Sequence, residues 1–280
     1  MLDYNNTPPE IKRKIAAAED TPADVLEKLS EDSDRTIRAL VASNPNTPTE
    51  FLLKLGEEFP DEITANPIFT LLMLENPDSE FIRLSLARSS TTASDILNKL
   101  AADGNYSVRL SVAKNPNTPV NILEKLLKDS NYHIRISVVK NPNTPVNILE
   151  KLALSSDEIV RTNVARNPNT PVNILEKLAK DSDYYIGISV AKNPNTPVNI
   201  LEKLTKDSNY NVRLYFAKNP NTPVNILEKL AKDSNQYVRQ TVAENQHTTV
   251  EILESLTNDR CLAVVEAARN RIADQLNISS

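Results

Sequence analysis

The sequence predicts an all-α protein built as a helical-repeat solenoid, and three observations support this fold class. The motif Asn-Pro-Asn-Thr-Pro occurs six times, and its last five copies are spaced by 26 residues. Each spacing holds two short stretches with apolar residues at helical intervals. The 280-residue chain also has 18 prolines but only 3 glycines, which suits helices joined by proline-bearing turns better than β-hairpins. We therefore predict an array of small helix pairs.

Ten repeats fill most of the chain when the threonine of the motif is taken as position zero. They begin at Thr21, Thr47, Asn66, Thr92, Thr118, Thr144, Thr170, Thr196, Thr222 and Thr248. The step from Thr47 to Asn66 is only 19 residues, and we expect Phe59-Pro60-Asp61 to form its shortened link. We divide the solenoid into an N-terminal capping half repeat (1–20), acidic and partly degenerate repeats (21–91), regular repeats (92–247) and a C-terminal capping repeat (248–280).

Local signals place the two helices within a repeat. In the repeat that starts at Thr170, the threonine is expected to cap the first helix, with Pro171 at its first position. Asp181-Ser182 interrupts the apolar pattern and is expected to cap the second helix, which must end at Asn193 because a proline follows. Helices this short are unstable alone, so their stability must come from packing against neighbouring repeats.

The repeated residues resemble those of the leucine-rich repeat variant family, a relative of HEAT-like repeats. The shared pattern is Asn-Pro-Asn-Thr-Pro-x-x-Ile-Leu-Glu-Lys-Leu, followed by an aspartate and Val-Arg-x-x-Val-Ala, and it covers about residues 5–275. The resemblance implies alternating α- and 3₁₀-helices stacked as a right-handed superhelix, with short second helices on the inner face. One type of member carries a cysteine-ligated iron–sulfur cluster before its repeats. No cysteine precedes Cys261 here, so that cofactor is not expected.

Arginine and aspartate recur at fixed positions and predict a structural ladder. Arginine stands at position +17 in seven repeats, and Gly187 replaces it in an eighth. An arginine fork can bind a carboxylate or the carbonyls at a helix end. We expect the asparagines beside the prolines to bond turn backbone rather than a ligand. The aspartates at +11 are Asp32, Asp103, Asp129, Asp181, Asp207, Asp233 and Asp259.

Variation between near-identical repeats concentrates on the second helix, at positions +14, +15, +18 and +19. These positions, together with +22, are predicted to form one exposed side of the inner face. Tyrosine is frequent there and offers a rigid, amphipathic contact, although tyrosines at +14 packing between repeats is an alternative. The candidate contact residues are Tyr106, Tyr132, His133, Tyr184, Tyr185, Tyr210, Tyr215 and Tyr237.

Charge is distributed unevenly along the chain, whose net charge is −5. Residues 1–91 hold 17 acidic and 9 basic side chains, whereas residues 92–247 hold 15 acidic and 20 basic ones. Five cations at +22 are expected to border the tyrosines, and stabilisation of a helix C-terminus is an alternative role for them. They are Lys114, Lys140, Arg166, Lys192 and Lys218.

These features favour a non-enzymatic scaffold that binds a protein or peptide along a tyrosine-rich inner face. The alternative is nucleic-acid binding through the basic, aromatic surface of the central repeats. The two histidines, His133 and His247, lack metal-ligand spacing, and no phosphate loop or nucleophile motif is present. One cysteine allows no internal disulfide, and no export signal or membrane-length apolar run occurs. We expect a cytoplasmic protein without a cofactor, a metal or a membrane partner.

Overall fold

The protein is all-α. The computed structural model describes residues 7–204 and 208–278, and these residues form 21 α-helices and no strand. None of the helices in these ranges is long and apolar enough to cross a membrane. Helix α1 (Pro9–Ala17) comes first, and ten helix pairs follow, which confirms the ten predicted repeats.

Each pair consists of a first and a second helix. The first helices are α2 (Ala23–Leu29), α4 (Thr49–Leu55), α6 (Pro67–Glu75), α8 (Ser94–Leu100), α10 (Val120–Leu126), α12 (Val146–Leu152), α14 (Val172–Leu178), α16 (Val198–Leu204), α18 (Val224–Leu230) and α20 (Val250–Leu256). The second helices are α3 (Arg35–Ser43), α5 (Pro60–Ala65), α7 (Glu80–Arg88), α9 (Tyr106–Lys114), α11 (Tyr132–Lys140), α13 (Glu158–Arg166), α15 (Tyr184–Lys192), α17 (Tyr210–Lys218), α19 (Gln236–Glu244) and α21 (Leu262–Ile278).

In the regular repeats the second helix is the longer one, with nine residues against seven in the first. Both kinds are α-helices, so the 3₁₀-helices implied by the family resemblance do not occur in the described repeats, and a second helix shorter than its first occurs in the repeat of α4 and α5. A second helix of this length has surface residues at both of its ends, and the candidate site described below consists of such residues.

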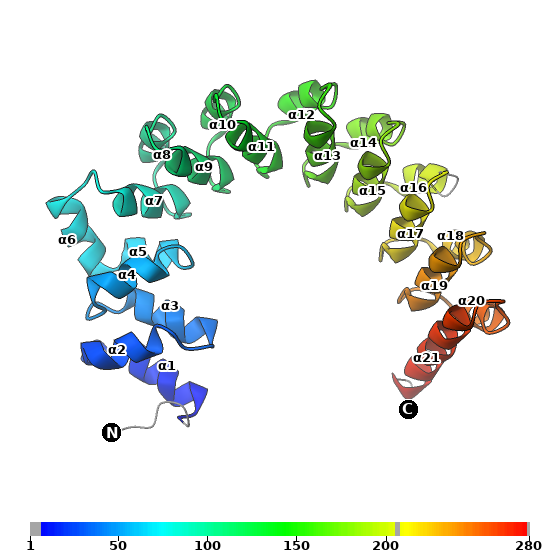
Figure 1. The fold of residues 1–280 in the computed structure, drawn as a ribbon, viewed down its shortest axis with the longest axis horizontal. Coiled ribbons are helices and arrows are strands. Elements are labelled where there is room, and N and C mark those ends of the chain that lie inside the picture. The colour runs from blue at the N-terminus through cyan, green and yellow to red at the C-terminus, as the bar shows by residue number, and fades with distance from the viewer. Residues whose placement is uncertain (1–6, 205–207, 279–280) are drawn as a thin grey trace. The chain divides into compact units, whose positions relative to one another are not determined.

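The chain divides into two compact units, Met1–Asn143 and Thr144–Ser280. Within each unit the second helices of successive repeats pack on one another, as α7, α9 and α11 do in the first unit and α13, α15, α17 and α19 in the second. Each first helix packs on the second helix of its own repeat, which gives two layers per unit (Figure 1). The division into four segments made from the sequence stays a prediction.

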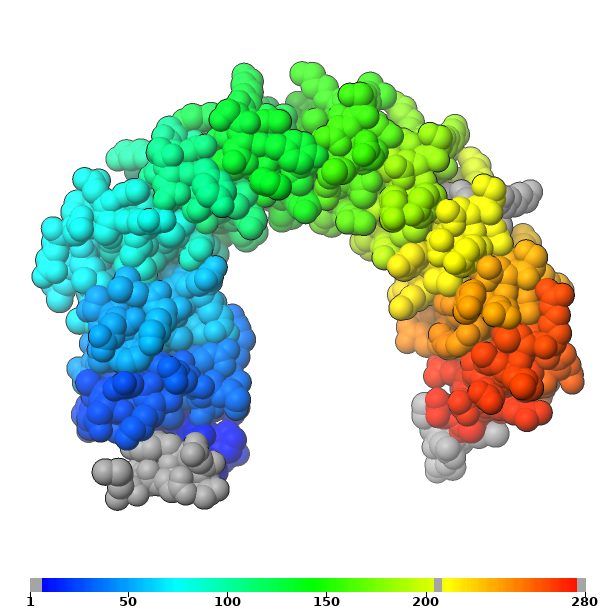
Figure 2. All heavy atoms as spheres, viewed as in Figure 1, coloured from blue at the N-terminus to red at the C-terminus, as the bar shows by residue number. Residues whose placement is uncertain are grey.

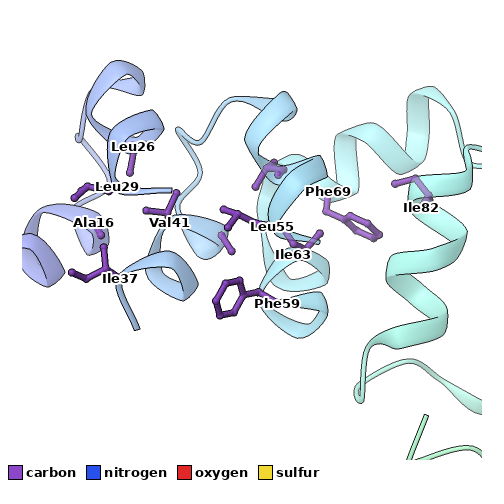
Figure 3. Packing of buried hydrophobic residues seen from close by; sticks show 12 residues of the cluster. Ala16, Leu26, Leu29, Ile37, Val41, Leu55, Phe59, Ile63, Phe69 and Ile82 are labelled. Carbon is purple, nitrogen blue, oxygen red and sulfur yellow. The ribbon is translucent and has the colours of Figure 1, made fainter. Parts of the chain in front are cut away.

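The core lies between the two layers. In the first unit it contains fully buried side chains such as Leu26, Ile37, Val41 and Ile63, which point toward one another from neighbouring helices (Figure 3). Side chains fill the space that a ribbon drawing leaves open between the layers of each unit (Figure 2). The buried residues of the first unit form two clusters, and the partly buried Leu86 packs against both of them.

The shortened repeat keeps both of its helices. The expected link Phe59-Pro60-Asp61 is wrong, because Pro60 is the first residue of α5 and Phe59 precedes it as the N-cap. The Phe59 ring is fully buried in the core. The repeat is therefore shorter because its second helix has only six residues and its connecting turn is brief.

The predicted threonine cap of the first helix is also wrong. Pro171 itself is the N-cap of α14, in an extended conformation, and the helix begins one residue later. Thr170 is fully buried, and its hydroxyl donates a hydrogen bond to the carbonyl of Val164, at 2.5 Å. The threonine thus ties the turn to the preceding second helix instead of capping the next one.

The cap of α15 is the residue directly after the predicted pair Asp181-Ser182. Asp183 is the N-cap of α15, and its carboxylate accepts the backbone N–H of Tyr185, at 2.7 Å. Asp181, two residues before the cap, accepts the backbone N–H of Asp183 with its carboxylate at 3.0 Å and so stabilises the cap. Asparagine takes the capping place in α9, α11, α17 and α19.

The first asparagine of each motif bridges two repeats, which confirms and extends its predicted structural role. Asn115 is buried, and its side-chain amide donates to the carbonyls of Ala87 (3.0 Å) and Ser89 (2.8 Å) in the preceding repeat. Its side-chain oxygen accepts the N–H of Asn117, at 2.9 Å, which closes an Asx turn. The same bridging bonds recur at Asn44, Asn66, Asn141, Asn193 and Asn245.

The arginine ladder is confirmed and joins successive repeats wherever an arginine at +17 is followed by an aspartate at +11 of the next repeat. Arg109 Nε donates to Asp129 Oδ2 of the following repeat at 2.7 Å, while its Nη1 donates to the carbonyl of Asp103 in its own repeat at 2.7 Å. Asp207 lies outside the described residues. Equivalent ion pairs join Arg83 to Asp103, Arg161 to Asp181, Arg213 to Asp233 and Arg239 to Asp259.

The ladder lowers the pKa of Asp129 and of Asp259. The hydrogen bond from Arg109 holds the pKa of Asp129 below its ordinary value, and Arg239 does the same for Asp259. A carboxyl group whose pKa is lower in the folded than in the unfolded chain stabilises the fold at pH values above its unfolded pKa. That contribution is lost as the pH falls through the folded pKa.

We expect Asn115→Ala to lower the free energy of unfolding by about 2–4 kcal/mol, because it leaves two buried carbonyls without a donor. Asn117→Ala is the matched control: its exposed amide makes one bond, to the carbonyl of Ser90 at 2.6 Å, and its loss should cost about 0.5–1.5 kcal/mol. Urea denaturation of both variants measures the difference. Equal losses of unfolding free energy in the two variants would show that burial of Asn115 does not increase its contribution to stability.

The ladder predicts acid sensitivity. We expect the free energy of unfolding to decline below about pH 4, where the ladder aspartates begin to take up protons. The double variant Asp129→Asn with Asp259→Asn should be less stable at neutral pH by about 0.5–1.5 kcal/mol per replaced ion pair, and its stability should decline less in acid. Urea denaturation over a pH series tests this. An unchanged pH slope in the variant would contradict the assignment.

Candidate partner-binding surface

The tyrosines lie at the N-terminal ends of the second helices. Tyr106, Tyr184 and Tyr210 are the first residues of α9, α15 and α17, and Tyr185 and Tyr237 are the second residues of α15 and α19. These five side chains are between 37% and 55% exposed. Such large aromatic side chains on the surface are available for contact. We call these five residues, at the N-terminal ends of their helices, the tyrosine ends.

Several of these rings contact one another. The Tyr184 and Tyr185 centroids are 4.1 Å apart within one helix, and Tyr210 of α17 lies 6.4 Å from Tyr237 of α19 in the next repeat. A hydrogen bond with the Tyr185 hydroxyl, aided by burial, raises the pKa of Tyr184 to about 12. The rings of the second unit therefore form pairs.

In the first unit the arrangement differs. Tyr132 is half-buried, with Arg135 5.6 Å from its ring centroid and the exposed His133 ring 6.0 Å away at a steep angle. Both of these contacts lie within α11, so the packing of a +14 tyrosine between repeats stays a prediction. His133 stands at the surface without a metal-binding group around it, since no cluster of His, Cys, Asp and Glu in the described ranges is suited to hold a metal ion.

Positions +18 and +19 are less exposed than predicted. Ile136 and Ile188 at +18 are buried, as is Ser189 at +19. The reason is that neighbouring second helices cover the middle of each helix. Small polar residues at +19 bond their own backbone, as Ser189 does by donating to the carbonyl of Tyr185 at 2.8 Å. Tyr215 at +19 is too large to be covered and remains half-buried.

All five cations at +22 are exposed, at the C-terminal ends of α9, α11, α13, α15 and α17. The expectation that they border the candidate tyrosines is confirmed at Tyr215, whose ring centroid lies 3.8 Å from Lys192 Nζ, but the cations do not border the tyrosine ends. A residue at +22 is the last of a nine-residue helix that starts at +14, so the two groups are separated by roughly 12 Å along the helix axis. The second-helix layer therefore has an aromatic end and a cationic end.

Two hollows lie at the cationic end in the second unit. The α15–α17 hollow has a volume of about 320 Å³ and is lined by Lys192, Pro194, Tyr215, Lys218, Asn219, Pro220 and Asn221. The α17–α19 hollow measures about 280 Å³ and is lined by Lys218, Pro220, Thr241, Glu244, Asn245 and Gln246. The wall residues of the turns were not predicted as site residues, because proline and asparagine recur there for structural reasons in every repeat.

A comparable hollow of about 420 Å³ in the first unit has mixed charge. Arg88 and Lys114 line it together with Glu57, and Arg88 lies 3.5 Å from the Glu57 carboxylate. The α15–α17 hollow differs because its lining contains two lysines and no acidic residue.

Gly187, which interrupts the arginine ladder, is buried in the middle of α15. A Cβ at this position would lie 3.4 Å from Val212 Cγ2 in α17, an ordinary packing distance. Gly187 does not line either hollow. It is thus a local gap in the ladder and not part of the candidate surface.

The fold defines the class of protein: a helical-repeat solenoid whose repeats are held together by asparagine and arginine ladders. Residues 160–183 match the family model described as "Leucine rich repeat variant", so this stretch resembles the repeats of that family. The structure is similar to a solved leucine-rich repeat variant with a repetitive structural motif described as novel. The TM-score is 0.51 at 26% identity, over 76% of this chain and 84% of that one. The predicted resemblance and fold are confirmed.

A solved engineered protein aligns with 97% of this chain and 95% of its own at 15% identity, with a TM-score of only 0.35. No curated protein matches the sequence.

We expect Gly187→Ala to stabilise the protein by about 0.5–1 kcal/mol, because alanine is the better helix former and its methyl group fits against Val212. Gly56→Ala is the contrasting control. Its Cβ would lie 2.8 Å from Phe81 Cε2, and crowding should destabilise the fold by about 1–3 kcal/mol. Thermal and urea denaturation measure both effects. A destabilised Gly187→Ala variant would show that the close contact with Val212 requires glycine.

Proposed function

We propose that this chain is a non-enzymatic scaffold that binds another protein through the tyrosine ends of its second helices. The observation that carries the proposal is a contrast within the repeats. The run Pro-Val-Asn-Ile-Leu-Glu-Lys-Leu is identical in five of them, whereas the exposed residues that begin the second helices differ. A constant scaffold with a varied aromatic surface is what recognition of a protein partner requires.

The paired rings of the second unit support this proposal. Tyr184 with Tyr185, and Tyr210 with Tyr237, present joined aromatic surfaces that are already ordered by their mutual contact. A preordered surface loses less conformational entropy on binding than free side chains do. Tyrosine also combines apolar area with a hydroxyl that can bond to a partner.

The alternative, nucleic-acid binding, is less well supported by the geometry. Stacking rings and phosphate-binding cations have to be close together to serve one strand. Here the tyrosine ends and the +22 cations occupy opposite ends of the helices, although Tyr215 lies beside Lys192, and Tyr184 and Tyr185 directly follow the acidic cap Asp183. A phosphate backbone would be repelled there.

The test places a photo-crosslinking amino acid at Tyr185 or Tyr237 and exposes the protein to lysate from its source. We expect each to capture the same discrete protein. The matched controls carry the crosslinker at Val172 or Val224, which are 47% and 45% exposed on first helices, and should not capture it. Tyr184→Ala with Tyr210→Ala should reduce the captured amount roughly tenfold, since hot-spot residues contribute at least about 1 kcal/mol each.

Equal capture from the valine and tyrosine positions would contradict the proposed surface. Crosslinks to nucleic acid alone would favour the alternative. Circular dichroism and thermal denaturation of the alanine variants serve to show that the fold survives.

A further inference from the structure

The cationic end of the second unit has a row of side chains without acidic partners. Arg166, Lys192 and Lys218 end three successive second helices, α13, α15 and α17. Within the described ranges none of them forms an ion pair, although Arg161 and Arg213 on α13 and α17 are paired with aspartates. The row ends at the next repeat, where Glu244 occupies the same position.

Contacts to the following repeat hold two of these cations in place. Lys192 Nζ lies 3.8 Å from the ring centroid of Tyr215, and Arg166 Nε donates to Ser189 Oγ at 3.1 Å. Each cation thus reaches from the last residue of one helix to position +19 of the next. The ammonium group of Lys192 is placed at the wall of the α15–α17 hollow, with Lys218 in the same wall.

Neutralisation of helix C-termini accounts for only part of this arrangement. A cation near the last turn is stabilised by the exposed carbonyls there. In this fold those carbonyls already accept protein donors: Asn219 donates from its side chain to the carbonyl of Ala191, at 2.6 Å. Lys192 lies over a ring of the next helix. The positive potential is therefore directed into the hollow.

We infer that the α15–α17 hollow and the cations beside it bind an extended acidic segment of the partner protein, with a carboxylate between Lys192 and Lys218. Pro194, Pro220 and the Tyr215 ring would contact the apolar atoms that flank the carboxylate. This inference rests on the proposed function, since it assigns part of the protein partner to the cationic end.

The spacing of the row sets the pattern of such a segment. Packed helices lie about 8–10 Å apart, and an extended polyproline II chain advances about 3.1 Å per residue with three residues per turn, so every third side chain lies on one face. A segment that crosses the second helices therefore passes one repeat about every three residues. Acidic side chains at every third position would meet Arg166, Lys192 and Lys218 in turn.

The experiment uses the full chain and a labelled peptide with glutamate at every third position, separated by alanine and proline. A second peptide with glutamine in place of glutamate is the neutral probe, and a labelled oligothymidine is the nucleic-acid probe. Fluorescence anisotropy at low salt measures all three. We expect binding of the glutamate peptide and none of the glutamine peptide. Binding of oligothymidine alone would overturn the inference in favour of nucleic acid.

Lys192→Gln with Lys218→Gln should weaken binding of the glutamate peptide by about fivefold to twentyfold, since each partly exposed ion pair contributes up to about 1 kcal/mol. Lys177→Gln with Lys229→Gln removes the same charge from exposed positions of the first helices and should leave binding nearly unchanged. Equal weakening by both pairs would show a nonspecific charge effect and overturn the inference.

A gain-of-function variant avoids any ambiguity from lost stability. Glu244→Lys replaces the acidic residue that ends the row in the α17–α19 hollow and should strengthen binding about twofold to fivefold for a peptide long enough to reach it. If Glu244→Lys does not strengthen binding of the peptide, the cations at the ends of successive second helices do not act as one continuous binding surface.

If the tyrosine positions capture a protein while no glutamate peptide binds, the proposed function stands and this inference fails. If the glutamate peptide binds and the tyrosine positions capture no protein, the cationic end binds acidic segments as inferred, whereas the surface assigned in the proposed function fails.

Discussion

The rest of the structure depends on the buried asparagine that begins each turn motif. Its amide donates to two carbonyls at the end of the preceding second helix, and its oxygen shapes its own turn. One side chain therefore satisfies groups in two successive repeats that neither could satisfy alone. Buried backbone carbonyls need such donors. An aliphatic residue of similar size at this position would leave these carbonyls unpaired.

The arginine–aspartate ladder adds a second link in the same direction. Arg161 binds Asp181 in the next repeat and the carbonyl of Ser155 in its own, so it joins a helix to the loops on both sides. Because the two ladders fix the spacing of repeats through turns and loops, the surface residues at the helix ends are not needed for stacking. The ends of the second helices are thus free to vary, as Tyr184 and Gln236 do at equivalent positions.

The fold could be predicted from the sequence because the repeat period, the prolines and the apolar spacing all report on local structure. The predictions that were wrong concern residues whose contacts are with a neighbouring repeat. Thr170 looked like a cap, but a carbonyl six residues earlier takes its hydroxyl. Position +19 looked exposed on an isolated helix, but the next second helix covers Ser189. Helical spacing gives the face of a residue and not what lies opposite it.

The same limitation applies to the candidate surface. Tyrosines and cations were predicted as one strip because they share one side of the helix. Tyr215 does lie beside Lys192, but the tyrosine ends and the cations at +22 are separated along the helix axis. That separation changes the chemistry. The tyrosine ends and the cationic end cannot serve the same small group of a ligand. Together they suit a partner long enough to cover both ends, with apolar contacts at one end and acidic side chains at the other. A folded protein with an extended acidic segment has that composition, which is why the second-helix layer favours a protein partner over a single nucleic-acid strand.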